Sequence, residues 1–333
     1  MNRSRFLGAA TAPLALLAMG ASGDGGSDAS SASTLPSLRV LLGNAAARRI
    51  DGATFLYDGR RYRGTFSRMD DGNVLSVVPL EGYLYGVVAR EMPPSWPPAA
   101  LQVQAICART YVLQRSDPRR PYDVATSEAD QVYGGIASEY QAATDAVDAT
   151  VGQVLHYGGA FAQIAYSSCC GGHTESSADA WNGAPIPYLL GVSCPWCAGS
   201  PEYAWTSSVD ANALVRATAN AASPTGDVTD LQLGPADRSG RVRSFTIVGA
   251  LGSAVVKAGA FRSAIGTRVV RSLLVSDVSP NGAASAPSFL LSGTGLGHGV
   301  GLCQWGANFM AAAGRSAADI AAFYFPGTQI AGD

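Results

Sequence analysis

Short stretches of alternating apolar and polar residues open the chain after residue 36. A period of two is typical of strands that bury one face, and Gly and Asp residues separate these stretches as they separate strands in a sheet. The predicted strands are Leu38–Leu42, Ala53–Tyr57, Tyr62–Phe66 and Val74–Val78. Residues 37–78 are therefore predicted to be a strand-rich start.

The pattern changes to helical spacing near Pro79. Apolar residues and one acid then fall on or beside a single helix face: Leu84, Val87, Val88 and Glu91. Prolines 93, 94, 97 and 98 break the chain, and a second helix follows, for which Ser95 is a candidate cap. Its apolar face carries Leu101, Ala105, Ala108 and Val112. Residues 79–114 are thus predicted to form a helix, a proline-rich elbow with Glu91, and a helix.

The remaining segments alternate between strands and short helices. Strand patterns return between Val151 and Thr174, and residues 203–292 are strand-rich with one helix at Val209–Asn220. A Gly-rich loop and two helices, Gln304–Ala313 and Ala317–Tyr324, make up residues 293–328. Runs of strands with helices grouped between them predict an α+β fold. We expect a single domain over residues 37–330, with mixed or antiparallel strands and a few helices lining a cleft.

The N-terminus has the pattern of a secretion signal. Arg3 and Arg5 precede an apolar run, Phe6–Ala18, that is too short to span a bilayer. We predict a signal peptide at residues 1–22 and a flexible Ser/Gly linker at 23–36; a transmembrane anchor is the alternative. The mature protein is then exported, to the periplasm or the cell wall. With 23 Lys+Arg against 25 Asp+Glu and no basic tract, nothing in the sequence favours a nucleic-acid partner.

Glu91 is the first candidate for chemistry. Its neighbours Val87, Val88, Met92 and Trp96 are apolar, and such surroundings disfavour the ionised carboxyl and raise its pKa toward neutrality. A general acid needs this property in order to protonate a glycosidic oxygen. The alternative is a solvated glutamate at a helix end, paired with Arg90.

Five ordered motifs give the chain a resemblance to a known family. They are residues 79–111 around the elbow, Asp130–Gly135, Gly171–Ser176, Gly297–Ala307 and Tyr324–Thr328. Together they closely resemble the SpoIID/LytB family of cell-wall proteins. The resemblance implies a lytic transglycosylase acting on peptidoglycan glycan strands, preferably without stem peptides, with Glu91 as the catalytic acid. It also implies that Gln131 and Tyr133 line the cleft.

A single carboxyl group is sufficient for such an enzyme. Hydrolases of glycosidic bonds use two carboxylates, one of which activates water or acts as nucleophile. A transglycosylase instead uses the 6-hydroxyl of the muramic acid, so one glutamate serves as acid and base and leaves a 1,6-anhydro end. Intramolecular attack also gains from proximity. Glu81, Glu128 and Asp130 are the second carboxylates whose closeness would overturn this assignment.

Four further residues are candidates for substrate binding. His298 lies among five glycines and is expected either to contact the sugar or Glu91, or to pack its own loop. Gln304 and Trp305 begin the next helix, where Trp305 is either a stacking platform for a sugar ring or a core residue. Arg109 either contacts a carboxylate such as the lactyl group of muramic acid or forms a structural salt bridge.

A cluster of Cys and His has the spacing of a metal site. Cys170 and His173, followed by Cys194 and Cys197, form two close pairs separated by a loop, as tetrahedral zinc coordination requires. We predict a structural zinc ion at these four residues, with Cys169 as a substitute for Cys170. Disulfides from Cys170 to Cys194 or Cys197, or between Cys107 and Cys303, are the alternative in an oxidising compartment.

Two other functions compete with the transglycosylase. Some members of the family are described as amidase enhancers, which predicts a wall-binding protein that stimulates a cell-wall amidase without cutting glycan itself. A zinc peptidase or amidase is a weaker reading, because the sequence has no H-E-x-x-H motif and three histidines in all.

Overall fold

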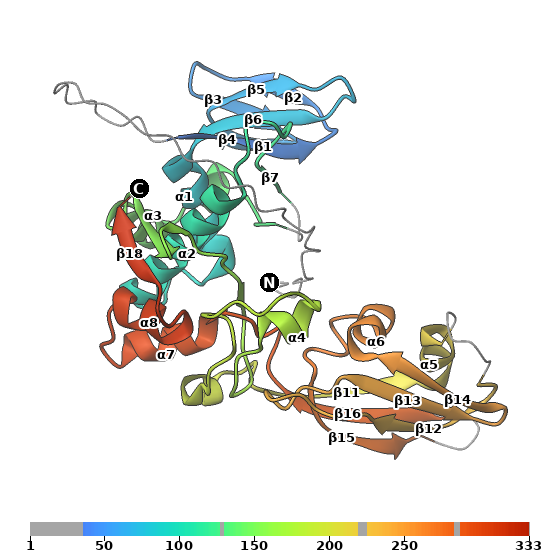
Figure 1. Cartoon of the computed structure of the whole chain (residues 1–333). Helices are drawn as coiled ribbons and strands as arrows, with labels where there is room; N and C mark the ends of the chain where they lie inside the picture. Colours follow the sequence, from blue (N-terminus) through green and yellow to red (C-terminus); the bar gives the residue numbers. More distant parts are fainter. Residues whose placement is uncertain (1–35, 127–129, 219–224, 283–286, 333) are drawn as a thin grey trace, which may run out of the picture.

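The computed structural model describes residues 36–126, 130–218, 225–282 and 287–332. The predicted signal peptide, almost all of the linker and Glu128 lie outside these residues. The described chain has an N-terminal strand region, a layer of helices beneath it, and a second group of strands at the far end of the molecule (Figure 1). This arrangement of separate sheets and helices confirms the predicted α+β class.

The N-terminal strands form two small sheets. One has the order β5-β6-β1-β7, made of β5 (Thr65–Arg68), β6 (Val74–Pro79), β1 (Ser37–Gly43) and β7 (Val124–Ala125). The other joins β2 (Ala47–Arg49), β3 (Thr54–Tyr57) and β4 (Arg60–Arg63). The predicted strand Tyr62–Phe66 is divided between β4 and β5. The division falls at Gly64, where φ is +84° and a Cβ atom would lie 2.0 Å from the carbonyl oxygen of Val77.

Five helices form the layer below these sheets (Figure 1). They are α1 (Leu80–Glu91), α2 (Pro98–Arg115), α3 (Gln141–Asp148), α7 (Gln304–Ala312) and α8 (Ala317–Tyr324). The predicted helix–elbow–helix is present, and α1 ends at Glu91. The residue that caps α2 is Pro97, whereas Ser95 is exposed within the elbow, so the proposed Ser95 cap is wrong. Most of α2 is buried, and the apolar face of this helix supports the active-site candidates around it.

Short strands tie distant parts of the chain to the helical layer. β8 (Gln153–Tyr157) pairs with β9 (Ala160–Phe161) and with the C-terminal β18 (Gln329–Gly332). β10 (Tyr166–Ser167) runs parallel to β17 (Leu302–Cys303), which leads directly into α7. The connection between β10 and the next sheet contains a short helix α4 (Ser177–Trp181), a 3-10 turn at Pro195–Gly199, and three of the six cysteines after Ser168.

Residues 204–294 form a separate unit, which we call the inserted β unit (Figure 1). Its two sheets are β11 (Ala204–Asp210), β16 (Ser288–Thr294) and β15 (Leu274–Asn281), and β12 (Val228–Leu233), β13 (Ser244–Gly249) and β14 (Gly252–Lys257). Helices α5 (Ala211–Ala217) and α6 (Ala258–Ile265) complete it. Its buried residues form their own cluster, with Phe245 and Phe261 stacked at 3.9 Å.

The second core of this unit was not apparent from the sequence, which suggested one continuous domain. The helix expected at Val209–Asn220 begins later, because Val209 and Asp210 belong to β11 and the Asp210 carboxylate caps α5 at the backbone N–H of Ala213. Asn220 lies outside the described residues. Within the described residues no helix combines the length and the apolar character needed to cross a membrane.

Candidate active site

Glu91 is the last residue of α1, and its side chain is 8% exposed. Burial is the main cause that raises its pKa, to about 7, while hydrogen bonds from Gln304 and from the backbone N–H of Val132 and the nearby charge of Arg90 act in the opposite direction. The predicted apolar surroundings are therefore present. The solvated alternative for Glu91 is excluded, because a carboxyl group with this burial is not facing bulk water.

The side chain that reaches Glu91 from the C-terminal part of the chain is Gln304. It is the first residue of α7, and its Nε2 lies 3.5 Å from Oε2 of Glu91 and 3.3 Å from Oε1 of Gln104. Gln104 comes from the middle of α2 and is fully buried. The sequence reasoning missed Gln104, although a glutamine beside the apolar positions Leu101 and Ala108 was a signal that could have been followed.

The carboxylates considered as partners of Glu91 are engaged elsewhere. Both oxygens of Glu81 accept hydrogen bonds from Arg109, at 2.9 and 2.6 Å. Arg109 itself has no exposed surface and also donates to the carbonyl oxygens of Gln153 and Val147. Asp130 accepts hydrogen bonds from the Tyr111 hydroxyl and the backbone N–H of Ala125. The structural salt bridge is therefore the correct reading of Arg109, and the substrate contact is contradicted, because its guanidinium group is enclosed.

Gln131 and Tyr133 are also buried rather than open to a cleft. The side chain of Gln131 accepts from Tyr83 at 3.1 Å and donates to the hydroxyl of Tyr166 at 3.1 Å. The Tyr133 ring packs on Tyr62 and Tyr83. It occupies the space left by Gly86, where a Cβ atom would lie 2.7 Å from the ring. The expected cleft lining is thus wrong for both side chains, and the segment reaches Glu91 through the backbone of Val132 instead.

The two nitrogens of His298 are occupied by its own surroundings. Nδ1 accepts from the backbone N–H of Val300 at 3.0 Å, and the ring also hydrogen bonds to the backbone of Tyr166. Burial, with the charges of Arg262 and Arg241, lowers the pKa of His298 to about 4, so the ring is neutral at pH 7. Trp181 covers it at 5.6 Å. The structure therefore favours the loop-packing alternative, and no described contact joins His298 to Glu91.

Trp305 belongs to a row of partly exposed aromatic side chains next to Gln304. Its ring lies 4.8 Å from Trp96 in the elbow and 5.9 Å from Phe309 on the next turn of α7. Trp96 and Trp305 come from the two segments that also supply Glu91 and Gln304. The arrangement leaves apolar ring surface open to a ligand beside the buried acid.

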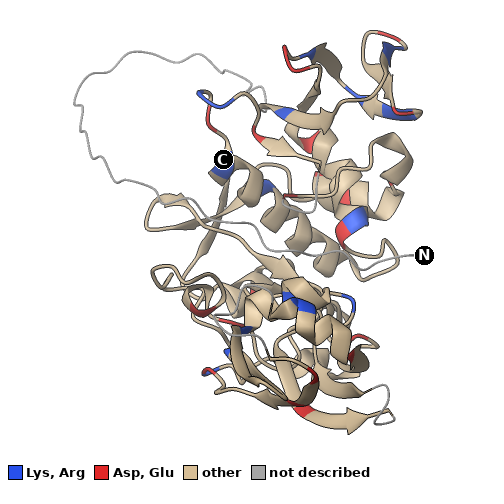
Figure 2. Cartoon of the chain, turned by 90° about the vertical axis from the view of Figure 1, so that its right-hand side faces the viewer, with Lys and Arg blue, Asp and Glu red and all other residues tan. Residues whose placement is uncertain are grey.

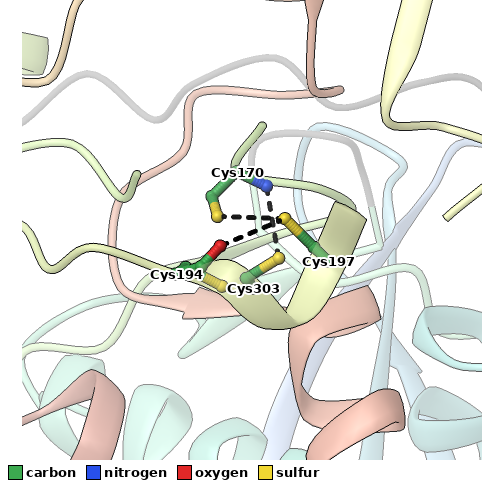
Figure 3. Close-up of side chains that lie close together, drawn as sticks. All are labelled: Cys170, Cys194, Cys197 and Cys303. Atoms are coloured by element: carbon green, nitrogen blue, oxygen red, sulfur yellow. Dashed lines mark hydrogen bonds between the residues drawn. The ribbon is translucent and has the colours of Figure 1, made fainter. Parts of the chain in front are cut away.

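Four cysteine side chains converge below the start of α7 (Figure 3). The sulfur atoms of Cys170, Cys194, Cys197 and Cys303 all lie within 4.8 Å of one another. Tetrahedral coordination with metal–sulfur bonds of about 2.3 Å places ligand sulfurs roughly 3.8 Å apart, and those of Cys170 and Cys197 are separated by 3.6 Å. These four cysteines can therefore hold a metal ion. All six cysteines are free, so neither predicted disulfide is present.

The fourth residue of this cluster is Cys303 and not His173. The ring of His173 faces the carbonyl oxygen of Thr174, 2.6 Å from Nδ1. Cys303 instead accepts hydrogen bonds from the backbone N–H groups of Cys170 and Gly306, at 3.2 and 3.3 Å. Such donors suit a thiolate ligand. The inclusion of His173 was wrong because a local spacing pattern cannot reveal a ligand from a distant part of the chain.

A hydroxyl group and a glycine complete the surroundings of the four cysteines. The Tyr324 hydroxyl lies 3.1 Å from the sulfur of Cys194. At Gly306 a Cβ atom would lie 1.9 Å from this hydroxyl and 3.1 Å from the same sulfur, so the glycine gives Tyr324 access. The motif residues of the last two helices therefore meet the cysteines directly.

A second buried carboxyl lies where the helical part meets the inserted β unit. Glu175 accepts from the Ser239 hydroxyl at 2.9 Å, and Arg241 lies 3.8 Å away. Burial is the largest cause that raises the pKa of Glu175, to about 7. Arg241 also donates to the carbonyl oxygens of Cys170 and His173. The sequence reasoning did not single out either residue, and their partners place them in this junction rather than beside Glu91.

Elsewhere, charged residues occur in small groups of both signs over the ribbon (Figure 2). The electrostatic environment of Glu91 is consequently set by its immediate neighbours. Arg90 is the charged group that acts on its pKa, and it lies next to Glu91 in the chain.

Comparisons with known proteins agree with this geometry. A family model described as stage II sporulation protein, SpoIID, matches residues 69–157, which include α1, the elbow and α2. The stage II sporulation protein D of Bacillus subtilis is 30% identical over 270 residues, 76% of this chain and 74% of its own. The chain belongs to the SpoIID family. An uncharacterized protein of Brachyspira hyodysenteriae is 31% identical over 284 residues, 83% of this chain and 74% of its own.

Two further matches extend the description of this SpoIID protein. The amidase enhancer of Bacillus subtilis is 28% identical over 295 residues, which are 74% of this chain and 40% of that protein. A model described as a domain of unknown function, DUF8618, matches residues 198–301. That range encloses the inserted β unit, so the unit with its own core coincides with a recognised sequence domain.

Proposed function

We propose that the protein is a peptidoglycan lytic transglycosylase that cleaves the MurNAc–GlcNAc linkage of glycan strands, preferably strands without stem peptides. The observation that carries the proposal is Glu91, a buried carboxyl with a pKa raised to about 7 beside a neutral amide donor. Such a group both donates and accepts a proton near neutral pH. Membership of the SpoIID family supports a cell-wall substrate.

In this mechanism the protonated Glu91 gives its proton to the glycosidic oxygen as the bond to the anomeric carbon breaks. The 6-hydroxyl of the same MurNAc attacks that carbon, and the Glu91 carboxylate takes the hydroxyl proton. The product is a 1,6-anhydroMurNAc end, and Glu91 returns to its acid form without consuming water. The engagement of Glu81 by Arg109 and of Asp130 by Tyr111 supports a single-carboxyl mechanism over a hydrolase pair.

Substrate contacts in this proposal come from the aromatic row. Trp305 and Trp96 are partly exposed beside the Glu91–Gln304 pair and offer ring faces to sugars. Gln304 acts on the acid itself. The buried residues His298, Gln131, Tyr133 and Arg109 then support the walls of the site instead of touching glycan.

We further propose that the four cysteines bind zinc in a structural role. Thiolate ligands suit zinc, and four protein ligands leave no position for a reactive water. The ion would hold Cys303 at the start of α7, next to Gln304. Export through the predicted signal peptide at residues 1–22 would deliver the protein to the periplasm or the cell wall, where its substrate lies.

Mass spectrometry of products from denuded glycan strands tests the proposal. Wild-type protein is expected to release fragments with 1,6-anhydroMurNAc ends, and Glu91→Gln to release none while its circular dichroism and unfolding transition stay those of a folded protein. Reducing ends in place of anhydro ends would show a hydrolase. Equal release by the variant would remove Glu91 from the chemistry.

The second candidate function is enhancement of a cell-wall amidase, which the 28% identity to the Bacillus subtilis amidase enhancer favours. In that case the protein binds peptidoglycan and produces no anhydro ends. Amidase activity measured on purified sacculi, with and without this protein, separates the two functions. Stimulation that survives Glu91→Gln, in the absence of any glycan cleavage, would support the enhancer.

A further inference from the structure

Gln104 lies behind the Glu91–Gln304 pair and has no exposed surface. Its Oε1 accepts a hydrogen bond from Nε2 of Gln304 at 3.3 Å, and the same nitrogen lies 3.5 Å from Oε2 of Glu91. The amide nitrogen of Gln304 therefore has two hydrogens and two acceptors. A chain of three polar side chains runs from α2 through α7 to the end of α1.

The hydrogen-bond pattern fixes how both amides face. An ionised carboxylate only accepts hydrogen bonds, so Gln304 must turn its nitrogen, and not its oxygen, toward Glu91. That nitrogen is also the atom nearest Gln104, which must then present its oxygen. With the oxygen directed at Gln304, the nitrogen of Gln104 points the other way, where it has no hydrogen-bond partner among the described residues.

This unpartnered nitrogen shows that stability does not explain the choice of glutamine. A buried N–H group without an acceptor costs free energy, whereas an apolar side chain of similar shape carries no such cost. Methionine at position 104 would fill the same space against the neighbouring α2 and α7 side chains. The polar oxygen of Gln104 is therefore kept for what it does to Gln304.

We propose that Gln104 is a positioning residue that holds the Gln304 amide with its nitrogen toward Oε2 of Glu91. Because a donor then occupies Oε2, the acid proton resides on Oε1, the oxygen left for the sugar. The inference rests on the proposed function for its purpose, while the hydrogen-bond chain itself does not depend on any activity.

Other titratable groups around Glu91 come from three elements. Arg90 and Tyr83 lie on α1, Tyr111 on α2 and Tyr166 on β10. The three tyrosines are neutral at pH 7, since their pKa values are raised above 10. Arg90 stays charged over the whole range. A change in the titration of Glu91 on substitution of Gln104 is then not the titration of one of these neighbours.

The test is a double-mutant cycle read by the titration of Glu91 itself. Protein labelled with ¹³C at glutamate carboxyls is titrated by NMR, and the Glu91 signal is assigned by its loss in Glu91→Gln. Gln104→Met frees the Gln304 amide to turn its oxygen toward the acid form of Glu91. The measured pKa of Glu91 is expected to rise by roughly half a pH unit, as loss of part of a hydrogen bond to a charged group implies.

In Gln304→Met the same donor is missing altogether, and the additional change Gln104→Met is expected to produce no further shift. A shift that persists in the Gln304→Met background would overturn the proposal, because Gln104 would then act on Glu91 by another route. An unchanged pKa in Gln104→Met alone would overturn it as well.

Thr110→Val is the matched control on the same helix. Thr110 is buried and its hydroxyl bonds to Ile106 and Leu155, away from Glu91, so the variant is expected to lose stability and leave the titration unchanged. Gln104→Met, by contrast, should unfold at an equal or higher temperature. If glycan cleavage is absent in wild type but the cycle is non-additive, the proposed function fails and the positioning role stands.

Discussion

Nε2 of Gln304 lies 3.5 Å from Oε2 of Glu91, although 213 residues separate the two along the chain. Glu91 is the last residue of α1 and Gln304 the first of α7, so the contact joins two helix ends. It forms only when α7 is docked against α2, on which Gln104 lies. The candidate site is consequently a property of the assembled helical layer and not of the elbow segment alone.

The raised pKa of Glu91 predicts a pH-dependent cost in stability. With a folded-state pKa of about 7 against an ordinary value of 4.5, the contribution of the protonated carboxyl is complete below pH 4.5 and is lost as the pH rises through 7. Glu91→Gln removes this loss. The stability of the variant relative to wild type, measured by urea unfolding, is expected to increase by about 3 kcal/mol between pH 4.5 and pH 8.

A suitable control is Glu139→Gln, because Glu139 is a partly exposed carboxyl that pairs with Arg63 at 2.6 Å. Loss of this ion pair is expected to lower stability slightly at pH 8 and not to raise it. A relative stability of Glu91→Gln that stays flat with pH would mean that Glu91 is not buried as described.

Arg109 is predicted to matter for folding and not for glycan affinity. Arg109→Met leaves the Glu81 carboxylate buried without its partner, which is expected to cost about 3–5 kcal/mol of unfolding free energy. The double variant Arg109→Met/Glu81→Gln should recover part of that loss. A variant of normal stability with a raised KM for glycan strands would instead restore the substrate contact that the structure contradicts.

Metal analysis distinguishes the two possible ligand sets. Wild type and His173→Gln are expected to bind one zinc ion per chain, whereas Cys303→Ser should bind less than one. Serine can still cap α7, so its effect isolates the lost ligand. Treatment with a strong chelator should lower the Tm of wild type by roughly 5–10 °C, equivalent to a few kcal/mol for a chain of this size.

Cys107→Ser serves as the control for the zinc measurements, because Cys107 is a buried cysteine outside the cluster. Its zinc content should equal that of wild type. Zinc loss in His173→Gln with retention in Cys303→Ser would show that the cluster of four sulfurs is not the binding site.

The aromatic row predicts a defect in binding. Trp305→Ala is expected to weaken the affinity for denuded glycan strands about tenfold and Trp305→Phe less, because aromatic contacts of this kind contribute on the order of 1 kcal/mol. Fluorescence titration or co-sedimentation measures the effect. Trp205→Phe, in the core of the inserted β unit, should not alter glycan affinity. If it does so as strongly as Trp305→Ala, the aromatic row is not the glycan contact.

The helix–elbow–helix was predictable because its signals are local. Apolar spacing marks α1 and α2, the prolines mark the break, and the greasy neighbours of Glu91 follow from the same few residues. The chain patterns of β1, β3 and β6 were equally readable. Gly64 divided one predicted strand for a reason outside that strand, the closeness of the Val77 carbonyl oxygen.

Partner choice was not predictable, because it depends on residues distant in the chain. Gln131, Tyr133 and Arg109 have side chains that suit a cleft, yet Tyr166, Tyr62 and Glu81 enclose them. His298 satisfies its own loop for the same reason. Cys303 was overlooked as a ligand since pairs of the C-x-x-C kind reveal only the near half of a metal site.

The chain enters the inserted β unit after Tyr203 and leaves it before Gly295, and the N–H of Gly295 donates to the carbonyl of Tyr203 at 2.6 Å. An insertion with touching ends adds mass without separating the segments that flank it. Lineages can therefore gain, lose or exchange such a module at low entropic expense. The contacts of Arg241 with Cys170 and His173 are the bonds that an exchange would have to rebuild.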